Sequence, residues 1–357
     1  MDTMTISDMA AHVERLGVVL TPDGSAAEAE GVLNPATART RDGRLLLFPR
    51  SVSAGNVSRI GLCRDVGTDR EPRFERDGFA LEPSGVTEVR STPGGYGCED
   101  PRITFIPLLD AYLMAYTAFG VDGPRIAFAI SEDAFRWTRL GLADFSADGV
   151  PEGDDKDGVF FPEPVLSPAG VRSFAFYHRP MVHVPALNPC AAAPMILAKP
   201  PAERECTRIA YVPVEPVLAD RRALCNVAES ALVLLPNDDW GPIKNGGGTP
   251  PVRIAEGWLS FFHGVDRQLG PSGECISMRY QGGIVIHDYE RPHIVRYRSP
   301  APIISPETPD ECSGTVANVV FPTGIDIVPG APDRTFEIYY GMADAKIGRA
   351  RVTLAPT

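Results

Sequence analysis

The sequence lacks the features that mark membrane, secreted and nucleic-acid-binding proteins. Its 34 Lys and Arg residues are outnumbered by 46 Asp and Glu residues, which gives a formal net charge of −12 at pH 7. Nucleic-acid binding needs clustered Lys and Arg, so this balance argues against such a partner. No apolar run approaches the roughly 18 residues of a membrane-spanning helix, and residues 1–20 lack the basic start and apolar core of a signal peptide. We therefore predict a cytoplasmic protein that binds neither membrane nor nucleic acid.

Paired cysteines and metal-binding motifs are also missing. The seven cysteines contain no CxxC pair and are scattered along the chain at Cys63, Cys98, Cys190, Cys206, Cys225, Cys275 and Cys312. An odd, unpaired set predicts reduced thiols rather than a disulfide framework or a zinc site. The six histidines show no ligand spacing such as HExxH. We expect no metal and no organic cofactor.

Helical patterns are almost absent. The single good candidate is 9–20, which Ser7 and Asp8 could cap, so we predict an N-terminal extension over 1–30 with one short helix. The rest of the chain, 31–357, is expected to form one catalytic domain. The whole chain contains 35 prolines and 34 glycines, which separate short runs rich in Val, Ile, Phe and Tyr. This pattern is typical of β-strands.

A long-period repeat organises these strands. Five runs share a proline near the start of a short strand, then a turn, then an apolar or aromatic strand; the prolines are Pro35, Pro101, Pro162, Pro250 and Pro322. The mean spacing of about 72 residues leaves room for about four strands a unit. This pattern predicts an all-β fold, a five-bladed β-propeller. The alternative is a β-sandwich of unrelated hairpins.

In a propeller, equivalent blade ends converge on one site, so the repeat predicts which residues meet. Asn34, Asp100, Glu163 and Thr249 lie next to repeat prolines, and the second strands end at Arg50, Thr117, His178, Arg179, His263 and Asp344. Arg side chains bind oxyanions, and Asp carboxylates accept hydrogen bonds from hydroxyl groups. This set of residues therefore favours a saccharide or a phosphorylated ligand.

Each of these residues also has a purely structural interpretation. Asp100 could be a turn residue before Pro101, Arg179 could pair with an acid of a neighbouring blade, and His263 could be a core histidine. The glycine-rich loop after Lys244 lacks the GK[ST] ending of a P-loop. Convergence at one site, more than any single motif, favours a functional role for them.

Nine motifs, taken together, resemble glycoside hydrolase family 130, the inverting β-mannoside phosphorylases and their hydrolase relatives. The resemblance runs from about residue 30 to the C-terminus and rests on "NPA" (34–36), "LLLFPRS" (45–51), "GCEDPRIT" (97–104), "KDGVFFPE" (156–163), "FYHRP" (176–180), "KNGGGTPP" (244–251), "GWLSFFHGV" (257–265), "GTVANVVFPTG" (314–324) and "YYGMADAKIG" (339–348). It implies a five-bladed propeller, in agreement with the repeat.

The resemblance also implies a reaction and a set of roles. Asp100 would protonate the mannose 3-hydroxyl, which passes its own proton to the glycosidic oxygen while inorganic phosphate attacks from the opposite face. The product would be α-mannose 1-phosphate. Asn34, Arg50 and Asp344 would hold the mannosyl unit, and His263 would line the site. Arg179 and Lys244 would bind phosphate. The expected partners are a β-mannoside oligosaccharide and phosphate. Relatives often form homo-oligomers, but the oligomeric state of this chain is not predicted.

One departure from the family pattern leaves the nucleophile open. Asp154 and Asp155 precede "KD" where many of these phosphorylases carry a basic or amide residue. Two carboxylates there would repel phosphate unless they turn outward or Lys156 compensates. They could instead act as a general base for water, so an inverting β-mannosidase is the alternative. A glycan-binding propeller without catalysis is a further one. The linkage, β-1,2 or β-1,4, is not predicted.

Overall fold

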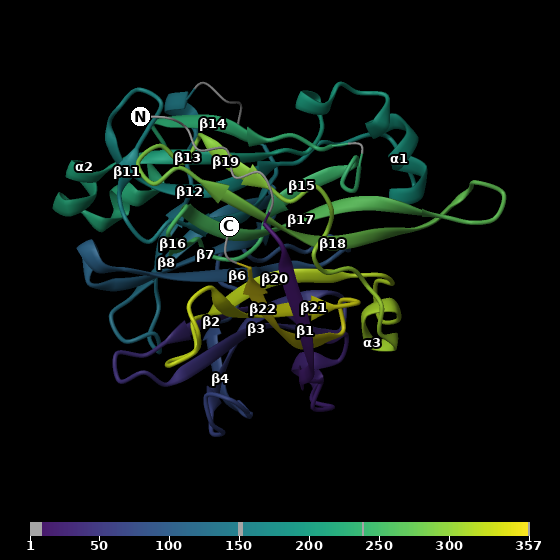
Figure 1. The fold of residues 1–357 in the computed structure, drawn as a ribbon, viewed down its shortest axis with the longest axis horizontal. Coiled ribbons are helices and arrows are strands. Elements are labelled where there is room, and N and C mark those ends of the chain that lie inside the picture. The colour runs from purple at the N-terminus through teal and green to yellow at the C-terminus, as the bar shows by residue number, and fades with distance from the viewer. Residues whose placement is uncertain (1–8, 149–152, 238, 356–357) are drawn as a thin grey trace.

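The structure, a computed structural model, describes residues 9–148, 153–237 and 239–355, and β-strands dominate them (Figure 1). The predicted all-β class is confirmed at this level. The helical segments in this part of the chain are short: η1 (Ala26–Glu28), η2 (Pro107–Leu109), η3 (Ser146–Asp148), α1 (Pro189–Leu197), η4 (Pro201–Glu203), α2 (Val214–Ala219), η5 (Arg221–Cys225) and α3 (Pro309–Cys312). Among the described residues, none of the helices has the length and apolar character to cross a membrane.

The largest sheet consists of two antiparallel groups of strands. Its strands are β2 (Gly31–Arg39), β3 (Leu45–Ser53), β4 (Val57–Asp65), β5 (Phe74–Leu81), β6 (Tyr96–Ile106), β7 (Ala111–Gly120), β8 (Gly123–Ser131) and β9 (Thr138–Leu142). Strands β2 to β5 form the first group and β6 to β9 the second. A short parallel pairing of β4 with β6, at Val57 with Tyr96 and Ser58 with Gly97, joins them.

Two further antiparallel sheets follow along the chain. The first contains β10 (Asp155–Phe160), β11 (Val165–Leu166), β12 (Arg172–Pro180), β13 (Thr207–Pro213) and β14 (Glu229–Leu234). The second contains β15 (Lys244–Gly247), β16 (Val252–Ile254), β17 (Gly257–Leu269), β18 (Cys275–His287) and β19 (Val295–Arg298). In Figure 1 the long hairpin of β17 and β18 reaches out beyond the other strands.

The last sheet joins the two ends of the described chain. Its order is β1-β22-β21-β20, with bounds β1 (Ala11–Leu20), β20 (Val320–Asp326), β21 (Thr335–Met342) and β22 (Lys346–Leu354). Figure 1 shows β1, in purple, lying against these yellow strands. The N-terminal segment therefore completes a sheet made by the C-terminal strands.

The predicted N-terminal helix is wrong, because residues 11–20 form strand β1. His12 and Glu14 are exposed while Ala11 and Val13 are less so, which is the two-residue alternation of a strand. Gly17, with φ 93°, disrupts the pairing register with β22, and such a backbone does not suit a helix. The proposed capping residues Ser7 and Asp8 lie outside the described residues. The domain boundary at residue 30 stays a prediction.

Three strands are interrupted by bulges at polar residues: β2 and β6 carry repeat prolines, and β10 ends two residues before Pro162. Register shifts occur in β2 between Leu33 and Ala36, in β6 between Glu99 and Arg102, and in β10 between Lys156 and Val159. The bulges contain Asn34 (φ 41°), Asp100 (φ 48°) and Asp157 (φ 63°). Asn and Asp tolerate this left-handed region better than other side chains do. A bulge breaks the strand alternation and re-aims the side chain, so the same device recurs in three strands.

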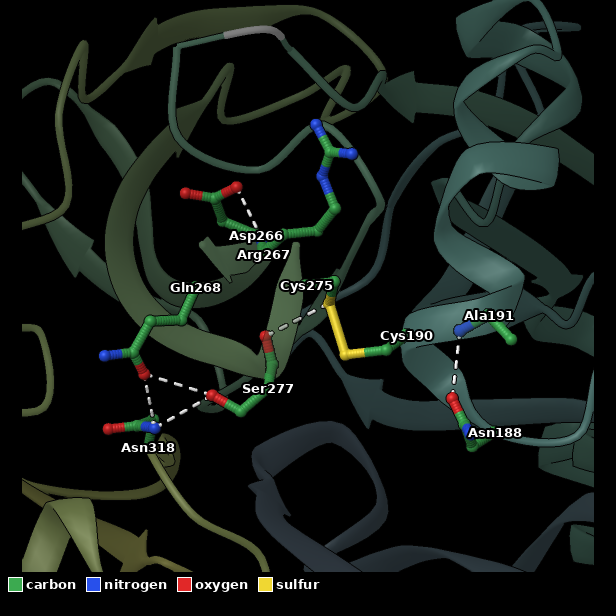
Figure 2. Close-up of a disulfide and its surroundings, with 9 residues drawn as sticks. All are labelled: Asn188, Cys190, Ala191, Asp266, Arg267, Gln268, Cys275, Ser277 and Asn318. Carbon is green, nitrogen blue, oxygen red and sulfur yellow. Dashed lines mark hydrogen bonds between the residues drawn. A yellow bond between two sulfur atoms is a disulfide. The ribbon is translucent and has the colours of Figure 1, made fainter. Parts of the chain in front are cut away.

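Two of the cysteines form a disulfide, so the prediction that all thiols are reduced is wrong for this pair. Cys190, in the first turn of α1, is bonded to Cys275, the first residue of β18 (Figure 2). Ala193 and Ile196 of α1 pack in one apolar cluster with Met278 of β18. This packing brings together two cysteines that are 85 residues apart in sequence. The prediction failed because it considered only closely spaced pairs such as CxxC. The other five cysteines are free.

Candidate active site

Asp100 is buried in the bulge of β6, where side chains from two other strands hold its carboxylate. The amide Nδ2 of Asn34 in β2 donates to Asp100 Oδ1 over 2.8 Å. A guanidinium N–H of Arg50 in β3 donates to the same oxygen over 3.1 Å. Three residues that sequence analysis assigned to one site therefore meet at one carboxylate.

Glu99, next to Asp100, accepts hydrogen bonds from two cationic side chains. Arg50 donates to Glu99 Oε1 over 2.9 Å, and Lys156 Nζ donates to Glu99 Oε2 over 2.8 Å. Arg50 is also fixed by a 2.9 Å hydrogen bond from its Nε to Ser58 Oγ. We call Asn34, Arg50, Glu99, Asp100 and Lys156 the Asp100 cluster.

Asn34 has an acceptor with no partner. Its Oδ1 is buried and makes no hydrogen bond within the described part of the chain. A Cβ added at Gly341 would lie 2.0 Å from that oxygen, so only glycine at this position leaves room for it. A buried acceptor beside an acid, with no hydrogen-bond partner, is suited to accept a hydrogen bond from a ligand hydroxyl.

The two aspartates assigned to sugar chemistry have pKa values shifted in opposite directions. Burial alone would raise the pKa of Asp100, but the positive charges of Arg50, Lys156 and Arg102 hold it below its ordinary value. Asp344 follows β21 in a turn with φ 49°, and burial raises its pKa to about 6; Arg50 opposes this shift and the charge of Asp100 adds to it. The lowered pKa keeps Asp100 ionised at neutral pH, whereas Asp344, with a pKa of about 6, takes up a proton in mildly acidic solution.

A second group of charged residues surrounds Asp157 in the bulge of β10. Arg179 Nε of β12 donates to Asp157 Oδ2 over 2.6 Å, and Arg102 Nη2 lies 3.4 Å from Oδ1. These cations, with His263, keep the pKa of Asp157 below its ordinary value although the carboxylate is buried. A Cβ at Gly246 would lie 2.1 Å from Asp157 Oδ2, so glycine is required for this close approach.

His263 of β17 lies beside Asp157 without a hydrogen bond. Its Nε2 is 3.7 Å from Asp157 Oδ2, and within the described residues neither ring nitrogen has a hydrogen-bond partner. Burial lowers its pKa to about 3, and the positive charges of Arg179 and Lys244 act in the same direction. His263 is therefore neutral at pH 7, with two ring nitrogens available to a ligand.

Lys244 and Glu205 complete this second group. Lys244 Nζ, at the start of β15, is 3.9 Å from Glu205 Oε2 and 5.3 Å from the centre of the Tyr280 ring. Arg179 Nη1 donates to the same oxygen of Glu205. We call the set the Arg179 cluster; its members are Arg102, Asp157, Arg179, Glu205, Lys244 and His263.

Arg102 and Lys156 join the two clusters. Arg102 is fully buried and donates from Nη1 to the backbone oxygen of Asp100 over 2.9 Å, while its Nη2 reaches Asp157. Lys156 bonds Glu99 and pairs in register with Arg179. An acid and a cation-rich group are thus held side by side by buried contacts.

Several residues that the repeat aligned are not members of either cluster. Glu163 is exposed and lies 3.5 Å from Arg253. The Thr249 hydroxyl accepts from the backbone N–H of Phe261, and Thr117 is buried opposite Glu99 in the β6–β7 pairing. His178 bonds Asp155 over 2.8 Å.

Asp154 and Asp155, the residues that raised the hydrolase alternative, are both engaged by histidines. His183 Nε2 lies 2.8 Å from Asp154 Oδ2. Asp155 is buried, bonds His178 and accepts from the backbone N–H of Arg179 over 2.9 Å. Its carboxylate therefore connects β10 to β12.

Asp157 and Glu205 are not among the residues predicted from the sequence. Asp157 stands in the quoted "KDGVFFPE", but alignment on Pro162 selected Glu163 instead. The Asp-Gly pair at 157–158 was the available signal, because such pairs mark left-handed backbone. Glu205 follows a proline-rich stretch and offers no local signal.

Fold and candidate site together describe an all-β protein in which buried polar residues gather at strand bulges. A family model described as β-1,4-mannooligosaccharide phosphorylase, glycoside hydrolase family 130, matches residues 12–185 and 223–355. The chain belongs to glycoside hydrolase family 130, and the resemblance drawn from its motifs is confirmed.

Individual relatives agree with the family assignment. The chain is 28% identical over 289 residues to a 1,2-β-oligomannan phosphorylase of Thermoanaerobacter sp. (strain X514), covering 78% of each protein. It is 36% identical over 124 residues to a β-1,4-mannooligosaccharide phosphorylase of Ruminococcus albus, covering 34% of each. The solved β-1,2-mannobiose phosphorylase of Listeria innocua, in complex with β-1,2-mannobiose, superposes with a TM-score of 0.69 at 20% identity, covering 95% of this chain and 96% of the other.

Proposed function

We propose that the protein is an inverting phosphorylase of β-mannosides, which cleaves them with inorganic phosphate and releases α-mannose 1-phosphate. The observation that carries the proposal is the adjacency of the Asp100 cluster and the Arg179 cluster through Arg102. An acid for the leaving group and cations for an anionic nucleophile are the two requirements of this reaction. Family membership and the phosphorylases among the relatives support it.

In this proposal Asp100 is the proton donor, acting on the mannose 3-hydroxyl, which passes its own proton to the glycosidic oxygen. The carboxyl must be protonated to begin, whereas Arg50 and Lys156 hold its pKa low in the free protein. A phosphate dianion bound at the Arg179 cluster would raise the pKa of Asp100, because a like charge nearby disfavours ionisation. Phosphate would then prepare the acid as well as supply the nucleophile.

Asn34, Arg50 and Asp344 are proposed to hold the mannosyl unit, and Arg179 and Lys244 the phosphate. The unpaired Oδ1 of Asn34 supports a sugar-binding role, because it needs a donor. His263, which was predicted to line the site, lies 3.7 Å from Asp157 Oδ2, and we propose that it contacts the substrate next to the phosphate. Phosphate is already an anion, so a base to activate it is not required and its position decides the rate.

We also propose that the four sheets are arranged as a five-bladed β-propeller. The parallel β4–β6 pairing covers two residue pairs, and dividing the eight-stranded sheet there leaves five groups of similar size. The bulged strands β2, β6 and β10 are neighbours, and β20 contacts β2. Strand β1 would close the ring by completing the blade of β20 to β22.

Product analysis on manno-disaccharides of β-1,2 and β-1,4 linkage, with and without phosphate, tests the function. We expect α-mannose 1-phosphate to form only when phosphate is supplied. Free mannose released at the same rate without phosphate would instead identify a hydrolase, and the absence of either product on all substrates would identify a binding protein.

The histidine contacts of Asp154 and Asp155 support the phosphorylase, because they occupy the carboxylates considered as a base for water.

A further inference from the structure

The carboxylate of Glu205 lies where the two proposed phosphate-binding cations meet. Arg179 Nη1 donates to Glu205 Oε2, and Lys244 Nζ is 3.9 Å from the same oxygen. Glu205 is buried, with 6% of the residue exposed. Both cations therefore face a carboxylate of the chain itself when no ligand is bound.

The backbone on both sides of Glu205 is fixed, so its side chain is the part that can move. The backbone oxygen of Glu205 accepts from the N–H of Asn245 over 3.2 Å. Two residues later, Thr207 donates from its N–H and its hydroxyl to Asn245 Oδ1 over 2.9 and 2.7 Å. These bonds tie the segment to β15, which begins with Lys244.

The two carboxylates of the Arg179 cluster are held differently. Asp157 interacts with Arg179 and Arg102 and has His263 beside it, and it sits in a bulge whose backbone is part of β10. Glu205 interacts through its side chain with Arg179, more distantly with Lys244, and with the backbone N–H of Val182 at 3.5 Å. Asp157 is part of strand β10, whereas Glu205 lies between η4 and β13, where its backbone forms a single β-bridge with Lys244.

The charges of the cluster fit an anion better without Glu205. Among the described residues, the cations Arg102, Arg179 and Lys244 face two carboxylates, with His263 neutral. Moving one carboxylate out leaves an excess of two positive charges, which matches a phosphate dianion. A buried carboxylate within about 4 Å of a phosphate would repel it strongly, so both anions cannot occupy the same cations at low cost.

We propose that Glu205 is a resident competitor for the phosphate site: its carboxylate takes the positions on Arg179 and Lys244 that phosphate oxygens occupy during the reaction, and phosphate displaces it. The inference rests on the proposed phosphorylase function. It makes Glu205 a residue that sets phosphate affinity, because every binding event must break the Glu205 contacts. The empty site meanwhile keeps its buried cations neutralised.

Glu205→Gln tests this inference, with Glu163→Gln as the matched control. The glutamine keeps an oxygen that can accept from Arg179 but removes the charge, while Glu163 is exposed and outside both clusters. Titration calorimetry with inorganic phosphate should give a Kd at least about tenfold lower for E205Q than for the wild type, given the size of a charge–charge term at this distance. In phosphorolysis, the KM for phosphate should fall while the KM for the mannoside stays unchanged. E163Q should match the wild type in both assays.

A gain in phosphate affinity in E205Q distinguishes a Glu205 that competes with phosphate from a Glu205 that only positions Arg179. If Glu205 only positions Arg179, E205Q will bind phosphate equally or more weakly, which overturns the inference. A crystal structure of the wild type with phosphate is an independent measurement that needs no variant: the Glu205 contact to Arg179 should be broken, and an intact contact beside bound phosphate refutes displacement. If the wild type forms no α-mannose 1-phosphate at any phosphate concentration, the proposed function fails; if it does and E205Q is unimproved, only the inference fails.

Discussion

Asn34 donates a 2.8 Å hydrogen bond to Asp100 although the two residues are 66 positions apart. Both sit in bulges of proline-bearing strands, with φ 41° and 48°. The separation equals that of Pro35 and Pro101, so the repeat in the sequence becomes a direct contact between corresponding residues. This contact links the candidate acid to a candidate sugar-binding amide.

Replacing Asp100 by Asn should remove most phosphorolysis. The amide keeps the shape of the side chain but cannot deliver a proton, and loss of a general acid costs about 10²–10⁴-fold in rate. The measurement is kcat for α-mannose 1-phosphate release, with circular dichroism to verify the fold. Near-wild-type turnover in a folded D100N protein would refute the assignment of Asp100 as the acid.

Replacing Lys244 by Ala should weaken phosphate use and spare the sugar. Lys244 contacts Glu205 and the Tyr280 ring, so its removal disturbs little else. Loss of a hydrogen bond to a charged group predicts an increase of about tenfold or more in the KM for phosphate. Steady-state kinetics with each substrate varied in turn provide the check. Arg253→Ala, which removes an exposed cation elsewhere, should change neither KM, and an equal loss for both substrates in K244A would argue against a phosphate-specific role.

Replacing Asp344 by Asn should change how stability depends on pH. The folded pKa of Asp344 is raised to about 6 from a reference value of 3.8, so the folded state binds this proton more tightly than the unfolded state. The ionised carboxylate is therefore destabilising above pH 6, and the penalty disappears as the pH falls through 6 toward 4. D344N should be more stable than the wild type by about 3 kcal/mol at pH 8, with no difference below pH 4.

Denaturant unfolding of both proteins between pH 4 and 8 measures this difference. A constant gap across the range would show that Asp344 does not titrate with a raised pKa. Asp344 is also proposed to bind the sugar, so the same variant should lose activity, and the two effects are separable because stability is measured without substrate.

Reducing the Cys190–Cys275 bond should destabilise the protein. The bond closes a long loop, because its cysteines are 85 positions apart in sequence, and removing such a crosslink typically costs about 2–4 kcal/mol. Thiol titration in denaturant should find five free thiols before reduction and seven after it. The Tm should fall on reduction, whereas a C190S/C275S variant should no longer respond to reductant.

Seven thiols in the unreduced protein would rule out the disulfide in solution. The thiol count also tests the predicted cytoplasmic location. Five free thiols in the unreduced protein would argue against that location, because structural disulfides are rare in reducing compartments.

Much of the site was predictable from sequence because local rules apply there. Alternating apolar runs between prolines and glycines set the β class, and a polar residue before a strand proline marked the bulges at Asn34 and Asp100. Their positive φ angles suit Asn and Asp, so residue type and backbone agree. The repeat supplied Arg50 and Arg179, and the motif resemblance supplied their roles, Lys244 as a phosphate ligand and the family.

The sequence by itself determined the β class and the repeat, since both follow from the placement of prolines, glycines and apolar runs, and its resemblance to the family indicated Asp100 as the candidate acid. Only the tertiary structure decided that residues 11–20 form a strand on the C-terminal sheet, that Cys190 meets Cys275, and that Glu205 lies on Arg179. Each of these depends on packing between segments far apart in the chain, and on the need of buried charges for partners. Such partners follow from three-dimensional proximity, which no local pattern encodes.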